Sequence, residues 1–508
     1  MSESRVINTK RNLFFSYIDL IITIVFSFVS KYLIVRTLGD QYLGLSGLFS
    51  SILQVLNMAE LGFSGAIVYN MYKPIAEGDT EKVCALLNYY RRVYRIVGLT
   101  VIIAGVCVAP FLPYLIHDNV PADINLFVLY CLYLANTGIS YLVFAYKAAL
   151  LNALQRMDLT KIAYSIVNIT QYILQIILLI TTKSYYAYIA VLIACTAGRN
   201  LLAARIASKK YPLLQCRGDV DKETRKDIFQ RVKGLLVCNI SSVTYTTFDN
   251  IILSSFVGLT AVAVYNNYYL ICGHLLNVIA IIRGAMQASV GNSVAKESVE
   301  KNYQDMLLWH FLFAVISTWC VTCMFSLYQP FMIMWMGEER LLPLVDVGLL
   351  CFWFFVIASQ HSFFMYSSGS GLWWEMRWPY ILSTICNLLL NIVLGKIIGI
   401  TGILFASAFS SCVFGLIWQC KIVLKKYFNR SVKQFQIYEL FYLLICVLSV
   451  FFSYIVNSLI LIDGILGMLI RLIVCTVISG VCMVLAYGKT EIFNRAFCFL
   501  KVVIRKKD

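Results

Sequence analysis

The sequence predicts an all-α integral membrane protein with about fourteen transmembrane helices. Of its 508 residues, 60% are hydrophobic and only 13% are charged. A soluble protein of this size does not bury so much apolar side chain, whereas a bilayer solvates it. The ten-residue segments of alternating polarity that are typical of outer-membrane barrels are absent. A helical bundle is therefore the expected architecture.

Apolar runs long enough to cross a bilayer recur along the whole chain. A helix needs about 20 apolar residues to span the hydrocarbon core. On that criterion the sequence predicts helices at 13–35, 42–71, 93–116, 124–146, 162–181, 185–207, 234–256, 261–285, 307–329, 344–367, 378–398, 401–424, 437–458 and 464–487. Because the number is even, both termini should lie on the same side of the membrane.

The distribution of Lys and Arg indicates which side that is. With both termini in the cytoplasm, all but six of the 42 Lys and Arg residues fall in cytoplasmic segments or at cytoplasmic helix ends. The positive-inside rule requires this asymmetry. We therefore expect a multi-pass membrane protein with both termini in the cytoplasm. Its net charge of +16 is then explained by anionic membrane lipids rather than by nucleic acid.

The longest polar connection predicts a division of the chain. It covers 208–233, is rich in Lys and Arg, and we expect it to be a basic cytoplasmic linker. On its two sides lie an N-terminal lobe of helices one to six (1–207) and a C-terminal lobe of helices seven to twelve (234–424). The last two helices and a basic cytoplasmic tail make up 425–508.

Ionisable side chains within or beside the first apolar runs are candidates for function, because a charge at membrane depth is costly unless it faces a protein interior or a water-filled cavity. In the first lobe these are Asp19, Lys31, Arg36, Asp40 and Glu60. The functional interpretation is a cavity with cations for an anionic headgroup and carboxylates for a coupling ion or proton. In the alternative, Lys31 snorkels to the outer interface and Arg36 pairs with Asp40 in a loop.

Polar residues also gather in the second lobe. They occupy the predicted helices 234–256 and 261–285 and comprise Asp249, Asn250, Asn266, Asn267, Tyr268, Tyr269 and Arg283. A run of Tyr and Asn is too polar to face lipid, so we expect it to face the interior. There it could bind sugar hydroxyls or join helices through interhelical hydrogen bonds. Both interpretations stay open.

The sequence predicts no cofactor. The G-x-x-x-x-G-K-[ST] nucleotide loop is absent, so we do not expect this chain to hydrolyse ATP. Cys320 and Cys323 form a C-x-x-C in an apolar helix without neighbouring His or carboxylate, which disfavours a metal site. Asp219 and Asp221 form the Asp-x-Asp pair of many glycosyltransferases. However, a connection of about 26 residues cannot supply a nucleotide-binding domain.

Four stretches resemble oligosaccharide-unit flippases, which form the polysaccharide transporter branch of the multidrug/oligosaccharidyl-lipid/polysaccharide exporter superfamily. They are VRTLGDQYLGLSGLFSSILQVLNMAELGFSGAI (35–67), YKPIAEGDTEKVCALLNYYRRVYRIVG (72–98), TFDNIILSSFVGLTAVAVYNNYYLI (247–271) and LLLNIVLGKIIGITGILFASAFS (388–410). The resemblance implies two pseudo-symmetric six-helix lobes that form a V around a central cavity and move by alternating access.

The same resemblance implies a cargo and roles for residues. The cargo is a polyprenyl-diphosphate-linked oligosaccharide, which crosses a bacterial cytoplasmic membrane for surface polysaccharide synthesis, in association with polymerase machinery. Lys31, Arg36 and Arg283 would bind the diphosphate. A proton or sodium ion would couple through carboxylates, for which the candidates are Asp19, Asp40, Glu60 and Asp249.

Three alternatives remain at this stage. An ion-coupled multidrug exporter of the same superfamily should have a cavity dominated by carboxylates and aromatic rings, and Lys31 and Arg36 argue against it. A peptidoglycan-precursor (lipid II) flippase would look much the same in sequence. A membrane-bound polymerase or glycosyltransferase should carry a large extracytoplasmic loop, whereas the predicted outer loops are short. We therefore expect a transporter rather than an enzyme.

Overall fold

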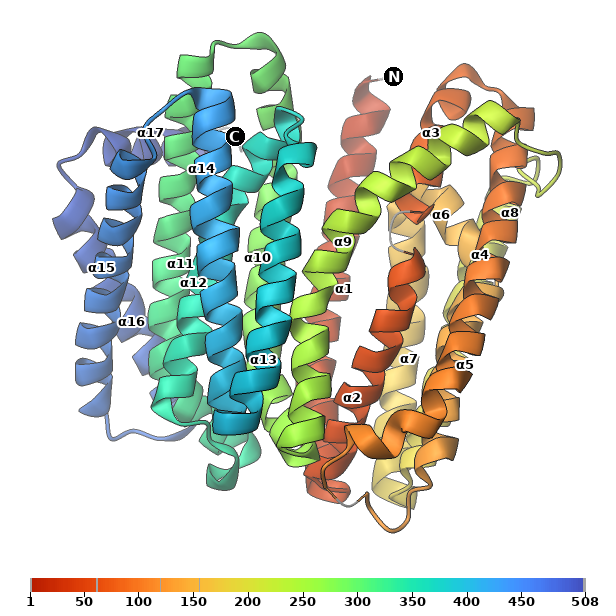
Figure 1. Cartoon of the computed structure of the whole chain (residues 1–508), viewed down its shortest axis with the longest axis horizontal. Coiled ribbons are helices and arrows are strands. Elements are labelled where there is room, and N and C mark those ends of the chain that lie inside the picture. Colours follow the sequence, from red (N-terminus) through yellow and green to blue (C-terminus); the bar gives the residue numbers. More distant parts are fainter. Residues whose placement is uncertain (1, 61–62, 119, 155, 506–508) are drawn as a thin grey trace. The chain divides into compact units, whose positions relative to one another are not determined.

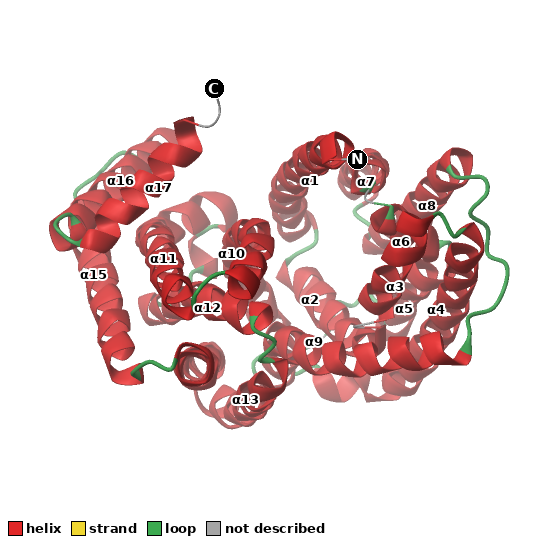
Figure 2. Cartoon of the chain, turned by 90° about the horizontal axis from the view of Figure 1, so that it is seen from above, coloured by secondary structure: helices red, strands yellow, loops and turns green. Residues whose placement is uncertain are grey.

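The computed structural model describes residues 2–505, apart from 61–62, 119 and 155. Over these residues the chain is helical and contains no strand (Figures 1 and 2). It divides into two compact units, Met1–Ala263 and Val264–Asp508. The predicted all-α membrane fold is confirmed, whereas the four-part division of the chain stays a prediction.

The first unit contains the helices of the N-terminal half and the start of α10 (Figure 1). Its elements are α1 (Ser2–Thr37), α2 (Asp40–Leu56), the 3-10 turn η1 (Asn57–Glu60), α3 (Phe63–Glu77), α4 (Thr80–Val108), the 3-10 segment η2 (Ala109–Leu115), α5 (Leu126–Leu142), α6 (Ala145–Ala153), α7 (Met157–Thr182), α8 (Tyr185–Lys210), α9 (Lys222–Phe256) and the first residues of α10 (Leu259–Lys296). Several helices begin at a side-chain cap, as α4 does at Asp79, whose carboxylate accepts the Lys82 N–H at 2.9 Å.

The second unit contains the rest of α10 and the remaining helices. These are α11 (Val299–Met336), the 3-10 turn η3 (Glu338–Arg340), α12 (Leu344–Gly369), α13 (Trp373–Ser410), the π-helical η4 (Ser411–Trp418), α14 (Gln419–Val423), the π-helical η5 (Leu424–Phe428), α15 (Val432–Ser458), α16 (Gly464–Tyr487) and α17 (Glu491–Arg505).

The chain is a multi-pass membrane protein, but the predicted count of fourteen helices is not confirmed. In the described part of the chain, ten helices are long and apolar enough to cross a membrane, or eleven if the bent pair α5 and α6 forms one span. The predicted helix 42–71 is divided, because α2 ends at Leu56 and α3 begins at Phe63. The predicted boundary between the helices 378–398 and 401–424 coincides with a break inside α13, where Ile398 and Gly399 have non-helical backbone angles (Gly399 φ 59°, ψ −131°).

In the first unit, α1 packs along α7, and α2 packs against α9. Figure 2 shows α1 and α7 side by side. The rings of Phe26 on α1 and Tyr172 on α7 stack with their centroids 4.8 Å apart. Helix pairs of this kind bury the apolar stripe that each helix carries, while the opposite stripe is left for lipid.

The connection between α8 and α9 is folded back onto the first unit. Within 211–221, the carbonyl of Gly218 accepts a hydrogen bond from Asn88 of α4 at 2.8 Å. The carbonyl of Leu214 accepts one from the Lys147 ammonium of α6 at 3.2 Å. Residues 222–233 of the predicted linker are the first turns of α9. The connection is therefore a packed part of the unit.

The Asp-x-Asp pair in this connection has structural partners. Asp219 forms ion pairs with Arg92 at 2.7 Å and with Arg225 at 3.6 Å. Asp221 caps α9 by accepting the Thr224 backbone N–H at 2.8 Å and the Thr224 hydroxyl at 2.7 Å. These two hydrogen bonds lower the pKa of the Asp221 carboxyl. Both carboxylates thus have structural roles, Asp219 in ion pairs with α4 and α9 and Asp221 as the cap of α9.

In the second unit, α11 is the central helix, and α12, α15 and α16 pack around it. Buried His310 of α11 joins two of them. Its Nδ1 lies 2.8 Å from the Ser362 hydroxyl of α12, and its Nε2 lies 2.5 Å from the Glu439 carboxylate of α15. This imidazole is a core histidine that supports helix packing.

We predict that Gly44→Ala destabilises the first unit. A Cβ at this position of α2 would lie 2.7 Å from the Leu259 carbonyl carbon and 2.8 Å from its Cβ. Backbone cannot move aside easily, so we expect a loss of about 1–3 kcal/mol. Thermal unfolding in detergent measures it, with Gly284→Ala as control, since nothing lies within 4 Å of that position. Equal melting temperatures for the two variants would contradict the prediction.

Candidate functional site

The first unit contains a polar cavity of about 350 Å³. Its walls are built by η1 and by helices α3 to α8, so elements far apart in the sequence meet there. The lining residues are Glu60, Ser64, Tyr90, Tyr94, Ser140, Tyr141, Ala145, Ala148, Ala149, Asn152, Tyr164, Thr196, Arg199 and Asn200. One carboxylate and one guanidinium are the charged groups among these lining residues.

The carboxylate belongs to Glu60, which ends the 3-10 turn between α2 and α3. Its Oε2 accepts a hydrogen bond from the Tyr141 hydroxyl of α5 at 2.7 Å. Its Oε1 accepts one from the Tyr94 hydroxyl of α4. Hydrogen bonds to an ionised acceptor are stronger than neutral ones. The helix break thus presents a carboxylate that two neutral donors stabilise inside the bundle.

Tyrosine rings form one wall of the cavity. Tyr90 and Tyr94 lie one turn apart on α4, with ring centroids 4.4 Å apart. The ring of Tyr141 follows at 5.6 Å from Tyr94. Such rings offer an apolar face together with a hydrogen-bonding hydroxyl. This wall can pack against the C–H face of a sugar or against an organic cation.

The guanidinium belongs to Arg199 on α8. Its Nη1 donates to the Asn168 side-chain oxygen of α7 at 3.1 Å, and its Nη2 donates to the Thr196 hydroxyl at 2.9 Å. Both acceptors are neutral, and no carboxylate of the described residues lies within ion-pair distance of Arg199. A half-buried, uncompensated cation is costly. Here it can receive an anionic ligand.

Sequence analysis missed Arg199, Tyr94 and Tyr141. The topology prediction counted Arg199 among the cytoplasmic cations, because it lies in the second half of an apolar helix. A local signal was present, since Thr196 one turn earlier and Asn200 next to it make this part of α8 polar. No local signal distinguishes Tyr94 and Tyr141 from other membrane tyrosines.

The other predicted residues of the first three elements lie outside this lining. Asp19 on α1 accepts hydrogen bonds from Lys161 at 2.8 Å and from Ser165 at 3.2 Å, both on α7. Lys31 is half-buried on α1, and Asp40 starts α2. The structure therefore does not bring these groups together with Glu60.

Arg36 lies in the last turn of α1 and is exposed. Its guanidinium lies 5.5 Å from the centre of the Tyr32 ring. A cation in this position also interacts favourably with the carbonyl end of the helix. It likewise lies outside the Glu60 cavity lining.

Asp249 and Asn250 belong to a buried polar seam between α2 and α9. The amide of Asn250 donates to the Ser51 hydroxyl at 2.9 Å. One turn before, Thr247 donates to the Gln54 side chain at 3.3 Å. These contacts match the interhelical role proposed for polar residues in membranes.

The polar run on α10 lies in the second unit and is mostly buried. The Tyr268 hydroxyl donates to Gln329 at 2.8 Å and accepts the Leu342 backbone N–H at 3.1 Å. Asn267 is fully buried. Asn266 and Tyr269 are half-buried, and the Tyr269 ring lies 5.8 Å from that of Trp353. The Tyr268 hydroxyl is thus used in helix packing.

Arg283, further along α10, contacts α12. Its Nη1 lies 3.3 Å from His361 Nδ1, and its guanidinium lies 4.5 Å from the centre of the Phe364 ring. In the described part of the chain, no group of three or more His, Cys, Asp or Glu side chains is placed to hold a metal ion.

Comparisons with known proteins give a family and a fold. The family model described as "Polysaccharide biosynthesis protein" matches residues 9–286, more than half of the chain. No curated protein matches the sequence significantly.

Solved structures similar to this chain include a lipid flippase and multidrug transporters. The lipid II flippase MurJ in an inward closed conformation matches with a TM-score of 0.64 and 14% identity, over 94% of this chain and 99% of that one. An inward-facing multidrug resistance MATE family transporter of the MOP superfamily matches with a TM-score of 0.62 and 15% identity, over 79% and 94%. The eukaryotic MATE transporter AtDTX14 matches with a TM-score of 0.58 and 12% identity, over 84% and 97%. At these identities the likeness establishes the fold.

We predict energetic coupling between Glu60 and Tyr141. Glu60→Gln and Tyr141→Phe should each cost about 1–3 kcal/mol, because each removes a partner of a charge-assisted hydrogen bond. The double variant should lose less free energy of unfolding than the sum of the two single losses, with a coupling energy of about 0.5–3 kcal/mol. Equilibrium unfolding in mixed micelles measures this cycle.

The matched control for this cycle is Tyr164→Phe. Tyr164 lines the same cavity but does not donate to Glu60, so its pair with Glu60→Gln should be additive within about 0.5 kcal/mol. Additivity in both cycles would mean that the Tyr141 contact does not stabilise the carboxylate.

Proposed function

The chain belongs to the polysaccharide biosynthesis protein family, and we propose that it is a flippase for a polyprenyl-diphosphate-linked oligosaccharide. The membership confirms the family resemblance found in the sequence. One observation carries the proposal. Arg199 is held by the neutral groups Asn168 and Thr196, in a cavity that is also lined by tyrosine rings, amides and the Glu60 carboxylate.

This cavity suits both parts of the cargo headgroup. The Arg199 guanidinium binds a phosphate oxygen pair through its planar set of donors. Tyr90 and Tyr94 pack against sugar rings. Asn152 and Asn200, which also line the cavity, exchange hydrogen bonds with sugar hydroxyls. The polyprenyl tail stays in the bilayer while the charged headgroup avoids the hydrocarbon core.

The position of the cavity within the first unit fits loading from the inner leaflet. Its residues on α6, such as Ala145, Ala148 and Asn152, flank Lys147, which donates a hydrogen bond to the Leu214 carbonyl of the connection 211–221 at 3.2 Å. The predicted topology puts this connection in the cytoplasm of a bacterial cell. Alternating access then exposes the headgroup at the other face, where polymerase machinery uses it.

Two sets of predicted residues complete the proposal. Lys31, Arg36 and Arg283 are further diphosphate contacts along the route of the headgroup. Glu60 is the first candidate for coupling to a proton or sodium ion, because binding either cation removes an acceptor from Tyr94 or Tyr141 and so changes the contact between η1, α4 and α5.

A second candidate is an ion-coupled exporter of organic cations. The contact of a carboxylate with tyrosine rings at Glu60 favours it, because such a site attracts cations. Arg199 in the same lining repels them. We therefore rank the flippase first.

We predict that Arg199→Ala abolishes flipping, whereas Arg199→Lys retains part of it. Loss of the charged hydrogen bonds should reduce transport at least about tenfold. The test is deletion of the gene in its host, complementation with each variant, and assay of lipid-linked intermediates together with surface polysaccharide. Arg205→Ala is the matched control, because Arg205 is an exposed residue of the same helix.

Accumulation of lipid-linked oligosaccharide inside the cells, with loss of surface polymer, supports the flippase. Normal polymer combined with sensitivity to cationic dyes would contradict it and favour the exporter. If the Arg199→Ala protein is present in the membrane at normal levels and is fully active, Arg199 is not part of the transport site.

A further inference from the structure

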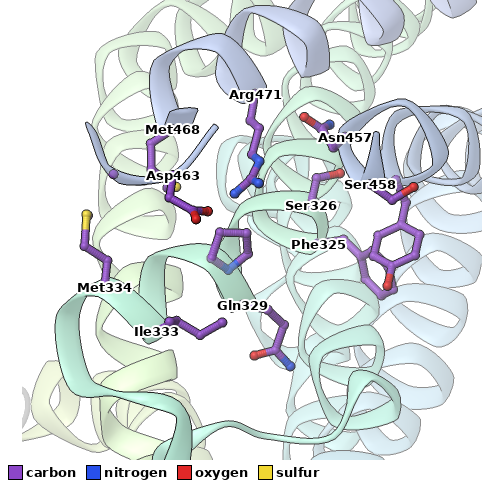
Figure 3. Close-up of a pocket in the computed structure, with 13 residues that line it drawn as sticks. Phe325, Ser326, Gln329, Ile333, Met334, Asn457, Ser458, Asp463, Met468 and Arg471 are labelled. Atoms are coloured by element: carbon purple, nitrogen blue, oxygen red, sulfur yellow. The ribbon is translucent and has the colours of Figure 1, made fainter. Parts of the chain in front are cut away.

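The second unit contains a separate cavity of about 580 Å³ that the proposed transport site does not use. It lies between the C-terminal end of α11, the C-terminal end of α15 and the start of α16. Figure 3 shows the thirteen residues that line it. Among these lining residues, the ionic side chains are one cation, Arg471, and one carboxylate, Asp463.

Arg471 is the eighth residue of α16 and lies in its third turn. Its Nη2 donates to the Ile460 carbonyl at 2.8 Å. Its Nε is buried and has no acceptor among the described residues. The guanidinium thus uses a neutral backbone group and keeps its charge uncompensated. Figure 3 shows this side chain directed into the cavity.

Asp463 precedes the first residue of α16 and makes no capping hydrogen bond. Its carboxylate also points into the cavity (Figure 3), yet the described contacts include no ion pair between it and Arg471. Two opposite charges in one cavity that do not neutralise each other can each receive a group of the opposite sign.

The inner wall offers an acceptor. Asn457 of α15 is only 5% exposed. Its amide nitrogen is oriented by the Ser453 carbonyl at 2.8 Å and by the Cys475 thiol at 3.3 Å. Its Oδ1 is buried and has no donor among the described residues. A buried amide oxygen without a donor costs about 1–3 kcal/mol, which a ligand with an N–H group removes.

The rim of the cavity is apolar. Ile333, Met334 and Tyr454 line it and remain 40–45% exposed. On a membrane helix bundle such side chains meet lipid acyl chains. The site therefore combines an anion receptor, a cation receptor and a hydrophobic edge.

We propose that this cavity binds the headgroup of a phosphatidylethanolamine-type phospholipid, with the phosphate on Arg471 and the primary ammonium on Asp463 and the Asn457 side-chain oxygen. A primary ammonium has three N–H donors, enough for both acceptors. The quaternary ammonium of choline has none. Glycerol in phosphatidylglycerol supplies no cation for Asp463. Because the predicted topology puts this end of the unit outside, the lipid belongs to the outer leaflet.

The test is native mass spectrometry of the full chain after exchange into equal mixtures of phosphatidylethanolamine, phosphatidylglycerol and phosphatidylcholine with identical acyl chains. The wild type should retain phosphatidylethanolamine over each of the other two by about fivefold or more. Arg471→Ala should lose this retention, and Arg471→Lys should keep part of it. Asp463→Asn should still bind phospholipid but lose the preference over phosphatidylglycerol.

Lys396→Ala is the matched control, because Lys396 is an exposed cation of the same unit that does not line the cavity. It should bind as the wild type does. Gel filtration and thermal unfolding of each variant check the fold. Equal retention of the three lipids, or unchanged retention in a folded Arg471→Ala protein, would overturn the proposal. Displacement of the lipid by inorganic phosphate would assign the cavity to a soluble anion and would overturn it as well.

Discussion

The need to stabilise the Glu60 carboxylate inside a membrane bundle organises the first unit. A charge at this depth is tolerated only where the protein supplies hydrogen-bond donors. The 3-10 turn between α2 and α3 releases the backbone from helical geometry and carries the carboxylate. Tyr94 and Tyr141 provide the donors from α4 and α5. One interaction thus holds three elements around a single cavity.

The sequence predicts the features that depend on local composition. Helical class and membrane insertion follow from the length and frequency of apolar runs, and both agree with the structure. The unusual position of Glu60 within such a run is also a local signal. Breaks inside an apolar run are harder to place, because a turn such as that between α2 and α3 depends on which neighbours pack against the chain. The break at Ile398 and Gly399, by contrast, coincides with the predicted boundary between 378–398 and 401–424. The number of membrane-crossing helices changes with each such break, and the count of fourteen stays a prediction.

The composition of the site depends on long-range contacts, which one sequence does not reveal. The residues that bind Glu60 lie 34 and 81 positions along the chain. Asp19 shows that residue type alone also misassigns a side chain to the site. It has the residue type expected for a cavity, yet Lys161, 142 positions away, pairs with it at 2.8 Å. Arg199 was grouped with cytoplasmic cations because the positive-inside rule treats a charge by its place along a helix and not by its neighbours.

Both cavities keep opposite charges apart, and this has a chemical reason. Arg199 shares a cavity with Glu60, as Arg471 does with Asp463, but neither pair forms an ion pair in the described structure. A direct pair would satisfy both charges and leave little attraction for a ligand. Neutral partners orient each arginine while its charge stays available, as preorganised sites require. Holding such charges in a membrane protein costs several kcal/mol per ion. Apolar side chains at these positions would avoid that cost, so the two arginines are better suited to binding an anion than to stabilising the fold.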